Sequence, residues 1–190
     1  MNEPKQIEID INPQLLEGML LRLENTKWPP TIGEDSWDYG VPKQWMQDMV
    51  NYWTTEWKWE NVAAQINEWK HFSVTIDQVP IHYLHAPGKG PNPKPLVLTH
   101  GWPWTFWDFK DVIGPLSDPE KYGGDPMDSF DVYVPSLPGF IFSSPLTKAG
   151  VDVREIAKLW NILMTKVLGH KKFCAHGGDW GALVLSLIHI

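Results

Sequence analysis

The chain has 190 residues, 43% of them hydrophobic and 21% charged, a balance typical of packed globular domains and unlike that of disordered chains. Its formal net charge of -7 and its lack of Lys/Arg clusters argue against nucleic acid and against acidic substrates. The sequence shows neither an apolar run long enough to span a membrane nor a signal peptide at its start. The single cysteine, Cys174, excludes an internal disulfide and fits a reducing compartment, so we expect a cytoplasmic protein in which this thiol is buried.

Helical patterns dominate the first third of the chain. Residues 13–25 carry leucines and a methionine at helical spacing, and Trp28-Pro29-Pro30 ends this predicted helix. Two further helices are predicted over residues 43–57 and 61–69. We therefore assign residues 1–70 to a helical N-terminal segment.

Short apolar runs and turns replace this pattern after residue 70. Residues 72–76 and 81–85 predict a β-hairpin, and residues 96–100, 130–134 and 172–175 predict buried strands, the last two separated by a helix over residues 153–168. Residues 71–190 are thus predicted to form part of an α/β domain with a mostly parallel sheet. The acidic stretch 117–128 lacks the ligand spacing of a calcium loop, so we expect a solvated loop there and no metal or cofactor.

The most informative motif follows the last predicted strand and reads Gly177-Gly178-Asp179-Trp180-Gly181. It is typical of a strand-to-helix elbow, a sharp turn that needs small residues around an exposed nucleophile. Asp179 is the candidate nucleophile. A carboxylate that attacks a saturated carbon forms an ester that water can hydrolyse afterwards, which suits epoxides or alkyl halides. The alternative is structural, since an aspartate also caps a helix well, here one predicted over residues 182–190.

A second turn offers backbone donors for such a reaction. The predicted strand 96–100 runs into Gly101-Trp102-Pro103, where the chain bends and exposes N–H groups. In hydrolases with this elbow, the oxyanion hole uses the N–H after the nucleophile and one from the loop of an earlier strand, here Trp180 and Trp102. We expect His100, Gly101 and Pro103 to shape this turn, with His100 fixing it through hydrogen bonds rather than reacting.

Four stretches besides the elbow form a pattern in their order and spacing. They are Trp57-Lys58-Trp59-Glu60, residues 76–83 (IDQVPIHY), residues 100–103 (HGWP) and residues 134–140 (VPSLPGF). Together with the elbow, they resemble the epoxide hydrolases of the microsomal type. The resemblance implies an α/β-hydrolase fold preceded by a helical segment, and conversion of an epoxide to a diol through an ester on Asp179. It also implies a small apolar epoxide and water as partners, and no cofactor.

The resemblance further implies a histidine base, its acidic partner and two ring-opening tyrosines downstream of the nucleophile. Here His189 is the only histidine after the elbow, and ten residues of helix would carry it roughly 15 Å from Asp179. All five tyrosines precede the elbow. We therefore expect the chain to be the front part of an enzyme, inactive by itself, whose uncovered strand edge favours self-association.

Two other interpretations stay open at the level of sequence. A haloalkane dehalogenase would use the same aspartate, with the indole N–H of Trp180 on the leaving halide, although the N-terminal helical segment favours the epoxide hydrolase. The third interpretation is an incomplete hydrolase fold that serves as a non-catalytic binding module.

Overall fold

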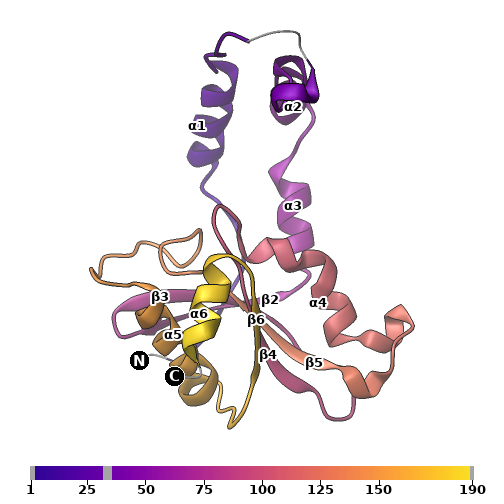
Figure 1. Cartoon of the computed structure of the whole chain (residues 1–190), viewed down its shortest axis with the longest axis vertical. Helices are drawn as coiled ribbons and strands as arrows, with labels where there is room; N and C mark the ends of the chain where they lie inside the picture. The colour runs from indigo at the N-terminus through magenta and orange to yellow at the C-terminus, as the bar shows by residue number, and fades with distance from the viewer. Residues whose placement is uncertain (1–2, 32–35, 189–190) are drawn as a thin grey trace. The chain divides into compact units, whose positions relative to one another are not determined.

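The computed structural model describes residues 3–31 and 36–188, which divide into two compact units (Figure 1). One unit is helical and runs from Ile9 to Ile66. The other contains the sheet, and it joins the N-terminal residues up to Glu8 to the chain from Asn67 onwards. The sequence predicts that the first residues belong to the helical segment, but strand β1 (Lys5–Ile7) pairs with β2 (Lys70–Ile76) and belongs to the sheet.

The helical unit contains α1 (Pro13–Glu24), α2 (Lys43–Thr55) and α3 (Trp59–Ile66). Helix α1 begins where the sequence predicts because the Asn12 side chain accepts a hydrogen bond from the Gln14 N–H at 2.9 Å, and Pro13 suits the first turn. The predicted helices are confirmed, with shifted ends. Helix α3 stops before the predicted residue 69, because the chain enters β2 at Lys70.

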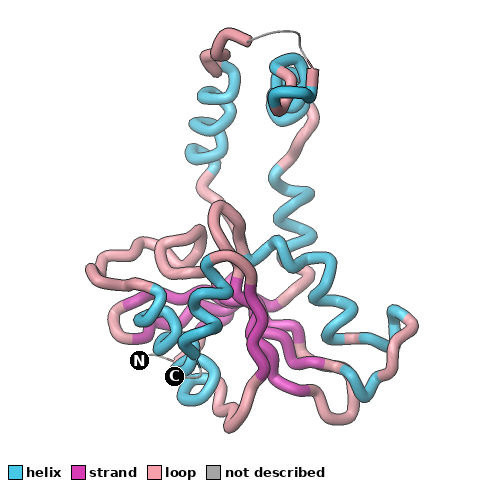
Figure 2. The backbone as a smooth tube through the Cα atoms, in the orientation of Figure 1, coloured by secondary structure: helices cyan, strands magenta, loops and turns pink. Residues whose placement is uncertain are grey.

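The described residues form a six-stranded sheet in the order β1-β2-β3-β5-β4-β6. Figure 2 draws the strands in magenta. The predicted hairpin is confirmed as β2 and β3 (Val79–Ala86). Its turn is tighter than predicted, because Ile76 pairs with Val79 and leaves only Asp77 and Gln78 between the strands. Both turn residues have positive φ, +48° and +66°, which is the backbone of a two-residue hairpin turn with the twist that suits adjoining strands.

The two halves of the sheet differ in strand direction. Strands β4 (Lys94–Thr99), β5 (Phe130–Pro135) and β6 (Cys174–Gly177) are parallel, whereas β1, β2 and β3 pair antiparallel and β3 runs antiparallel to β5. The α/β class is confirmed, but the sheet is mixed, and the predicted parallel pattern holds only for the half that carries the elbow. The side chains of successive residues along each strand point to opposite faces of this sheet.

Helices cover both faces of the sheet (Figure 1). On one face, α5 (Val153–Ile162) and α6 (Trp180–Ile188) pack on a core that includes Val97 and the fully buried Trp160. The Trp160 indole N–H donates to the Thr99 hydroxyl at 3.0 Å, which ties this core to the end of β4. On the other face, α4 (Lys110–Ser117) contacts β3 and β5. Short 3-10 helices lie at Trp37–Tyr39, Phe106–Phe109, Pro119–Tyr122 and Pro126–Asp128.

Four sequence predictions for the chain from residue 153 onwards need correction. Strand β6 starts at Cys174 rather than 172 and continues to Gly177, because its ladder with β4 runs on until Thr99 faces Gly177. Cys174 is exposed rather than buried, since β6 is an edge strand. Helix α6 begins at Trp180, directly after the elbow, and not at 182. The predicted helix over 153–168 ends at Ile162 and passes into a π-helical turn over Leu163–Val167.

Candidate active site

The elbow places one acidic side chain between β6 and α6. Asp179 has φ of +52°, a left-handed conformation that is uncommon for residues other than glycine. Such backbone costs about 1–3 kcal/mol and persists where the surrounding structure imposes it, often at functional sites. The Asp179 side chain is exposed, as a nucleophile must be to meet a substrate.

Two of the elbow glycines are required by close contacts, and one is not. A Cβ on Gly181 would lie 2.1 Å from the Thr99 carbonyl oxygen, and a Cβ on Gly177 would lie 2.8 Å from the same atom. Both contacts are too short for any side chain, so the end of β4 packs directly against the elbow backbone. A Cβ on Gly178 would meet nothing within 4 Å. The motif predicts that all three glycines make room for the turn, and this prediction is wrong for Gly178.

The loop after β4 meets the elbow at the carboxylate. The backbone N–H of Trp102 donates to Oδ1 of Asp179 at 2.8 Å. The pKa of Asp179 lies below its ordinary value, first because of this N–H and second because of the N–H of Trp180. The structure therefore brings Trp102, Trp180 and Asp179 together. An aspartate that only capped its own helix would not explain the bond to Trp102, which lies on a different loop.

His100 and Gly101 form the base of this loop. His100 is buried, with Nδ1 2.9 Å from the Gly101 carbonyl oxygen and Nε2 3.0 Å from the Leu137 backbone nitrogen. Burial lowers the pKa of His100, and the hydrogen bond to Gly101 and the charge of Asp108 oppose this only in part. Pro103 follows Trp102 through a cis peptide bond.

An apolar pocket of about 530 Å³ lies between the two tryptophans. Trp102 comes from the loop after β4 and Trp180 from the start of α6. The other lining residues are aliphatic, aromatic or proline side chains: Leu137, Pro138, Phe140, Val151, Ile156 and Val184. A pocket of this volume with an apolar lining, next to the Asp179 carboxylate and its backbone donors, fits a small apolar molecule.

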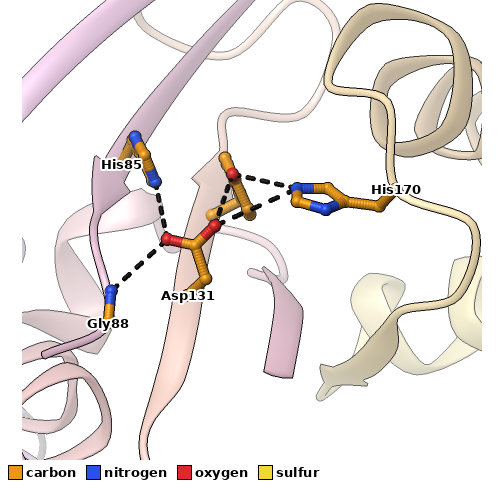
Figure 3. Close-up of polar contacts among 5 residues, drawn as sticks. His85, Gly88, Asp131 and His170 are labelled. Atoms are coloured by element: carbon orange, nitrogen blue, oxygen red, sulfur yellow. Dashed lines mark hydrogen bonds and ion pairs between the residues drawn. The ribbon is translucent and has the colours of Figure 1, made fainter. Parts of the chain in front are cut away.

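A second polar cluster, which the sequence does not predict, lies at the ends of the strands opposite the elbow (Figure 3). Asp131, at the start of β5, accepts from His85 Nε2 at 2.8 Å, from the Tyr133 hydroxyl at 2.7 Å and from the Gly88 N–H at 3.4 Å. His170 Nε2 lies 2.9 Å from the Tyr133 hydroxyl oxygen, and since that hydroxyl donates to Asp131, His170 must donate to it. Burial alone would raise the pKa of Asp131, but the hydrogen bonds from His85 and Tyr133 outweigh it and lower that pKa.

This second cluster gave no local signal in the sequence. Its members come from β3, β5 and the turn before β6, so only strand pairing could reveal it. Within residues 3–31 and 36–188, no group of three or more His, Cys, Asp or Glu side chains is placed to hold a metal ion. A helix able to cross a membrane is also absent from this described part, because none there combines the needed length with apolar character. His189, which its expected distance from Asp179 argues against as the base, lies outside the described residues.

Residues 4–109 match the protein family described as Epoxide hydrolase N terminus, which is more than half of the chain. The chain belongs to the epoxide hydrolase family. It is 39% identical over 184 residues to a protein of Stigmatella aurantiaca assigned to the epoxide hydrolases, covering 96% of this chain and 42% of that one. It is 30% identical over 188 residues to Epoxide hydrolase 1 of Oryctolagus cuniculus, covering 96% of this chain and 41% of that protein.

Solved structures of epoxide hydrolases share the fold. The juvenile hormone epoxide hydrolase of the silkworm Bombyx mori superposes with a TM-score of 0.83 at 26% identity, over 98% of this chain and 49% of that one. The Aspergillus niger epoxide hydrolase gives a TM-score of 0.81 at 24% identity, over 96% of this chain and 48% of that one, which shows the fold alone. These matches confirm the predicted α/β-hydrolase fold and the resemblance. The chain spans about two fifths of the length of the curated relatives above.

Proposed function

We propose that Asp179 is the nucleophile of an epoxide hydrolase that converts a small apolar epoxide to a diol. The observation that carries the proposal is the 2.8 Å hydrogen bond from the Trp102 N–H to Oδ1 of this exposed elbow carboxylate. Family membership supports epoxide chemistry over the haloalkane dehalogenase alternative. The apolar pocket between Trp102 and Trp180 supports an apolar substrate.

The geometry assigns different tasks to the two carboxylate oxygens. Because Trp102 binds Oδ1, we assign the attack on the ring carbon to Oδ2. The Oδ2–C bond forms as the bond between that carbon and the ring oxygen breaks, and the ring oxygen takes up a proton to become a hydroxyl group. The Cγ atom then becomes an ester carbon whose carbonyl oxygen is Oδ1. When water adds to Cγ, negative charge develops on Oδ1, where the Trp102 and Trp180 N–H groups stabilise it; one such donor is worth about 3 kcal/mol. Collapse breaks the Cγ–Oδ2 bond, so the diol leaves with an oxygen from Asp179.

The low pKa of Asp179 suits the first step. Its hydrogen bonds to backbone N–H groups favour the ionised form, so the carboxylate needs no base before it attacks. A base is needed only for the water that hydrolyses the ester, a contribution of about 10² to 10⁴ in rate. Ring opening also needs a proton for the ring oxygen, which water must supply in place of the downstream tyrosines. We therefore expect this chain by itself to form the ester only slowly and stoichiometrically, without turnover.

The test is alkylation of the chain by styrene oxide, followed by intact mass and peptide mapping. We expect one adduct on Asp179, and none there in Asp179→Asn, because an amide oxygen is a poor nucleophile and asparagine tolerates positive φ. Asp111→Asn, which changes an exposed aspartate on α4, is the control and should alkylate normally. A folded chain without an adduct on Asp179 would favour the binding module instead.

A labelling experiment then tests the route of hydrolysis. The isolated adduct is hydrolysed at alkaline pH in heavy-oxygen water. We expect ordinary oxygen in the diol and the label in the Asp179 carboxylate, because water adds at Cγ. Label in the diol would exclude this route.

A further inference from the structure

A single peptide unit connects His100 to the proposed oxyanion hole. The Gly101 carbonyl and the Trp102 N–H belong to the same peptide group, which is trans and planar, so the two bonds point in opposite directions. His100 Nδ1 holds the carbonyl end at 2.9 Å, and Asp179 Oδ1 accepts from the N–H end at 2.8 Å. If this peptide unit turned over, the Gly101 carbonyl oxygen would take the place of the Trp102 N–H beside the Asp179 carboxylate. The carboxylate would then face an acceptor in place of a donor.

The tautomer of His100 follows from its second contact. The Leu137 backbone N–H can only donate, so the nitrogen that it meets at 3.0 Å, Nε2, must carry a lone pair. A neutral imidazole then has its proton on Nδ1, which donates to the Gly101 carbonyl oxygen. Both ring nitrogens are thus satisfied in one orientation of the ring.

We propose that His100 is a positioning residue that orients the Gly101–Trp102 peptide and thereby aims the Trp102 N–H at Asp179. The proposal rests on the proposed function, because the aimed donor matters only if charge develops on Oδ1. This role is more specific than fixing the turn. The hydrogen bond from His100 Nδ1 orients one named donor of the oxyanion hole, the Trp102 N–H.

The loop after β5 provides the anchor for the ring. Leu137 follows Ser136, whose carbonyl oxygen accepts from the Ser143 hydroxyl at 2.7 Å. That hydroxyl also accepts from the His82 backbone N–H at 2.9 Å, and Ser143 is fully buried. The position of the Leu137 N–H is therefore set by β3 and β5, and through His100 these strands support the loop after β4.

The charged state of His100 would break this arrangement. A proton on Nε2 would face the Leu137 N–H, which places two donors against each other. The titratable groups that face His100 are Asp108 from the 3-10 helix Phe106–Phe109 and His82 from β3, while Asp179 lies beyond Gly101. Because burial lowers the pKa of His100 below its ordinary value of about 6.5, the neutral form with its proton on Nδ1 persists above that lowered pKa and is lost only as the pH falls through it.

The experiment compares two variants of nearly equal shape, His100→Asn and His100→Leu. The asparagine amide can donate to the Gly101 carbonyl oxygen from the place of Nδ1, whereas leucine cannot, and both lose the contact with Leu137. The styrene oxide adduct on Asp179 is formed and its alkaline hydrolysis followed by mass. We expect hydrolysis at least about tenfold slower in His100→Leu and within about threefold of the unsubstituted chain in His100→Asn, since one donor can be worth 10² or more. Equal rates in the two variants would overturn the proposal.

A second readout needs no adduct and so separates this proposal from the proposed function. The backbone amide resonance of Trp102 is followed in protein labelled with ¹⁵N-tryptophan and assigned with Trp102→Phe. His100→Leu should shift it as far as Asp179→Gly does, and His100→Asn should leave it near its original position. Below pH 6.5 the resonance should titrate in the unsubstituted chain but not in His100→Asn. A Trp102 resonance unaffected by His100→Leu would overturn the proposal even if Asp179 alkylates.

A third measurement needs no variant at position 100. The ¹⁵N shifts of the His100 ring should show the proton on Nδ1 at pH 8. A proton on Nε2 would contradict the geometry on which the proposal stands. Absence of the adduct in the unsubstituted chain, with the expected tautomer and Trp102 shifts, would count against the nucleophile and leave the role of His100 in place.

Discussion

Gly101 and Asp179 touch without room for a side chain between them: a Cβ at position 101 would lie 2.6 Å from both Cβ and Oδ1 of Asp179. The two residues are far apart in the chain, and their contact joins the loop after β4 to the elbow after β6. The glycine in the loop is therefore required by the nucleophile candidate rather than by the turn alone.

Gly101→Ala should slow alkylation of Asp179 at least about tenfold, because the added methyl group must push the carboxylate away from the Trp102 N–H; tenfold corresponds to about 1.4 kcal/mol. Overpacking should also lower the free energy of unfolding by about 1–3 kcal/mol. Gly178→Ala is the matched control, since its Cβ would meet nothing within 4 Å. Similar alkylation rates in the two variants, measured by intact mass, would contradict the contact.

Acid should destabilise the fold through the buried His82. Burial lowers the pKa of His82 from 6.5 to about 3, with His71 and His100 adding to the effect. The unfolded chain takes up this proton near pH 6.5 and the folded chain does not. Stability is therefore full above about pH 6.5 and falls between 6.5 and 3, by up to about 1.4 kcal/mol per pH unit for this group. Urea unfolding between pH 8 and 5 measures the slope.

The slope should be smaller in His82→Gln, whose side chain does not titrate. His176→Gln changes an exposed histidine on β6 and should leave the slope as it is. An unchanged slope in His82→Gln would show that other groups take up the proton.

Asp131→Asn should cost about 1–3 kcal/mol of unfolding free energy at pH 7, because three donors would lose a charged acceptor. The folded pKa of Asp131 is below its ordinary value, so its contribution is present above about pH 4 and lost as the pH falls through that folded pKa. The difference between variant and unsubstituted chain should therefore shrink in acid. Asp111→Asn should stay within about 0.5 kcal/mol of the unsubstituted chain in the same urea titrations.

Strand β6 should mediate self-association. It is an edge strand with β4 on one side, and within the described residues its other side has no pairing strand. Unpaired edges invite pairing with a second copy, and the half-exposed Leu183 on α6 adds apolar surface nearby. Sedimentation velocity should show association that Cys174→Lys reduces, because a charged edge disfavours pairing. Asn51→Lys on α2 adds the same charge elsewhere and should have no effect; a sharp monomer peak for the unsubstituted chain at high concentration would refute the idea.

Local sequence was sufficient for the three N-terminal helices, for most of the strands and for both turns of the site, but it did not reveal β1. Helical spacing of apolar residues predicted α1, and a glycine-rich run after an apolar stretch predicted the elbow around Asp179, because steric limits on the backbone act over a few neighbouring residues. The choice of Trp102 and Trp180 as donors rests on the general arrangement of hydrolases with this elbow and not on a local pattern. Local reasoning overestimated Gly178, since no local pattern shows which glycine another strand will contact.

Tertiary structure decided those features that depend on pairing between segments far apart in the sequence. The register of β4 with β6 brings Thr99 opposite Gly177, and this places the Trp102 N–H on Asp179. The edge position of β6 exposes Cys174, although the apolar run around it predicts burial. The cluster around Asp131 exists because β5 inserts between β3 and β4. Strand order and register depend on the packing of the whole sheet, so a sequence pattern specifies which residues can form a strand but not which strand will lie beside it.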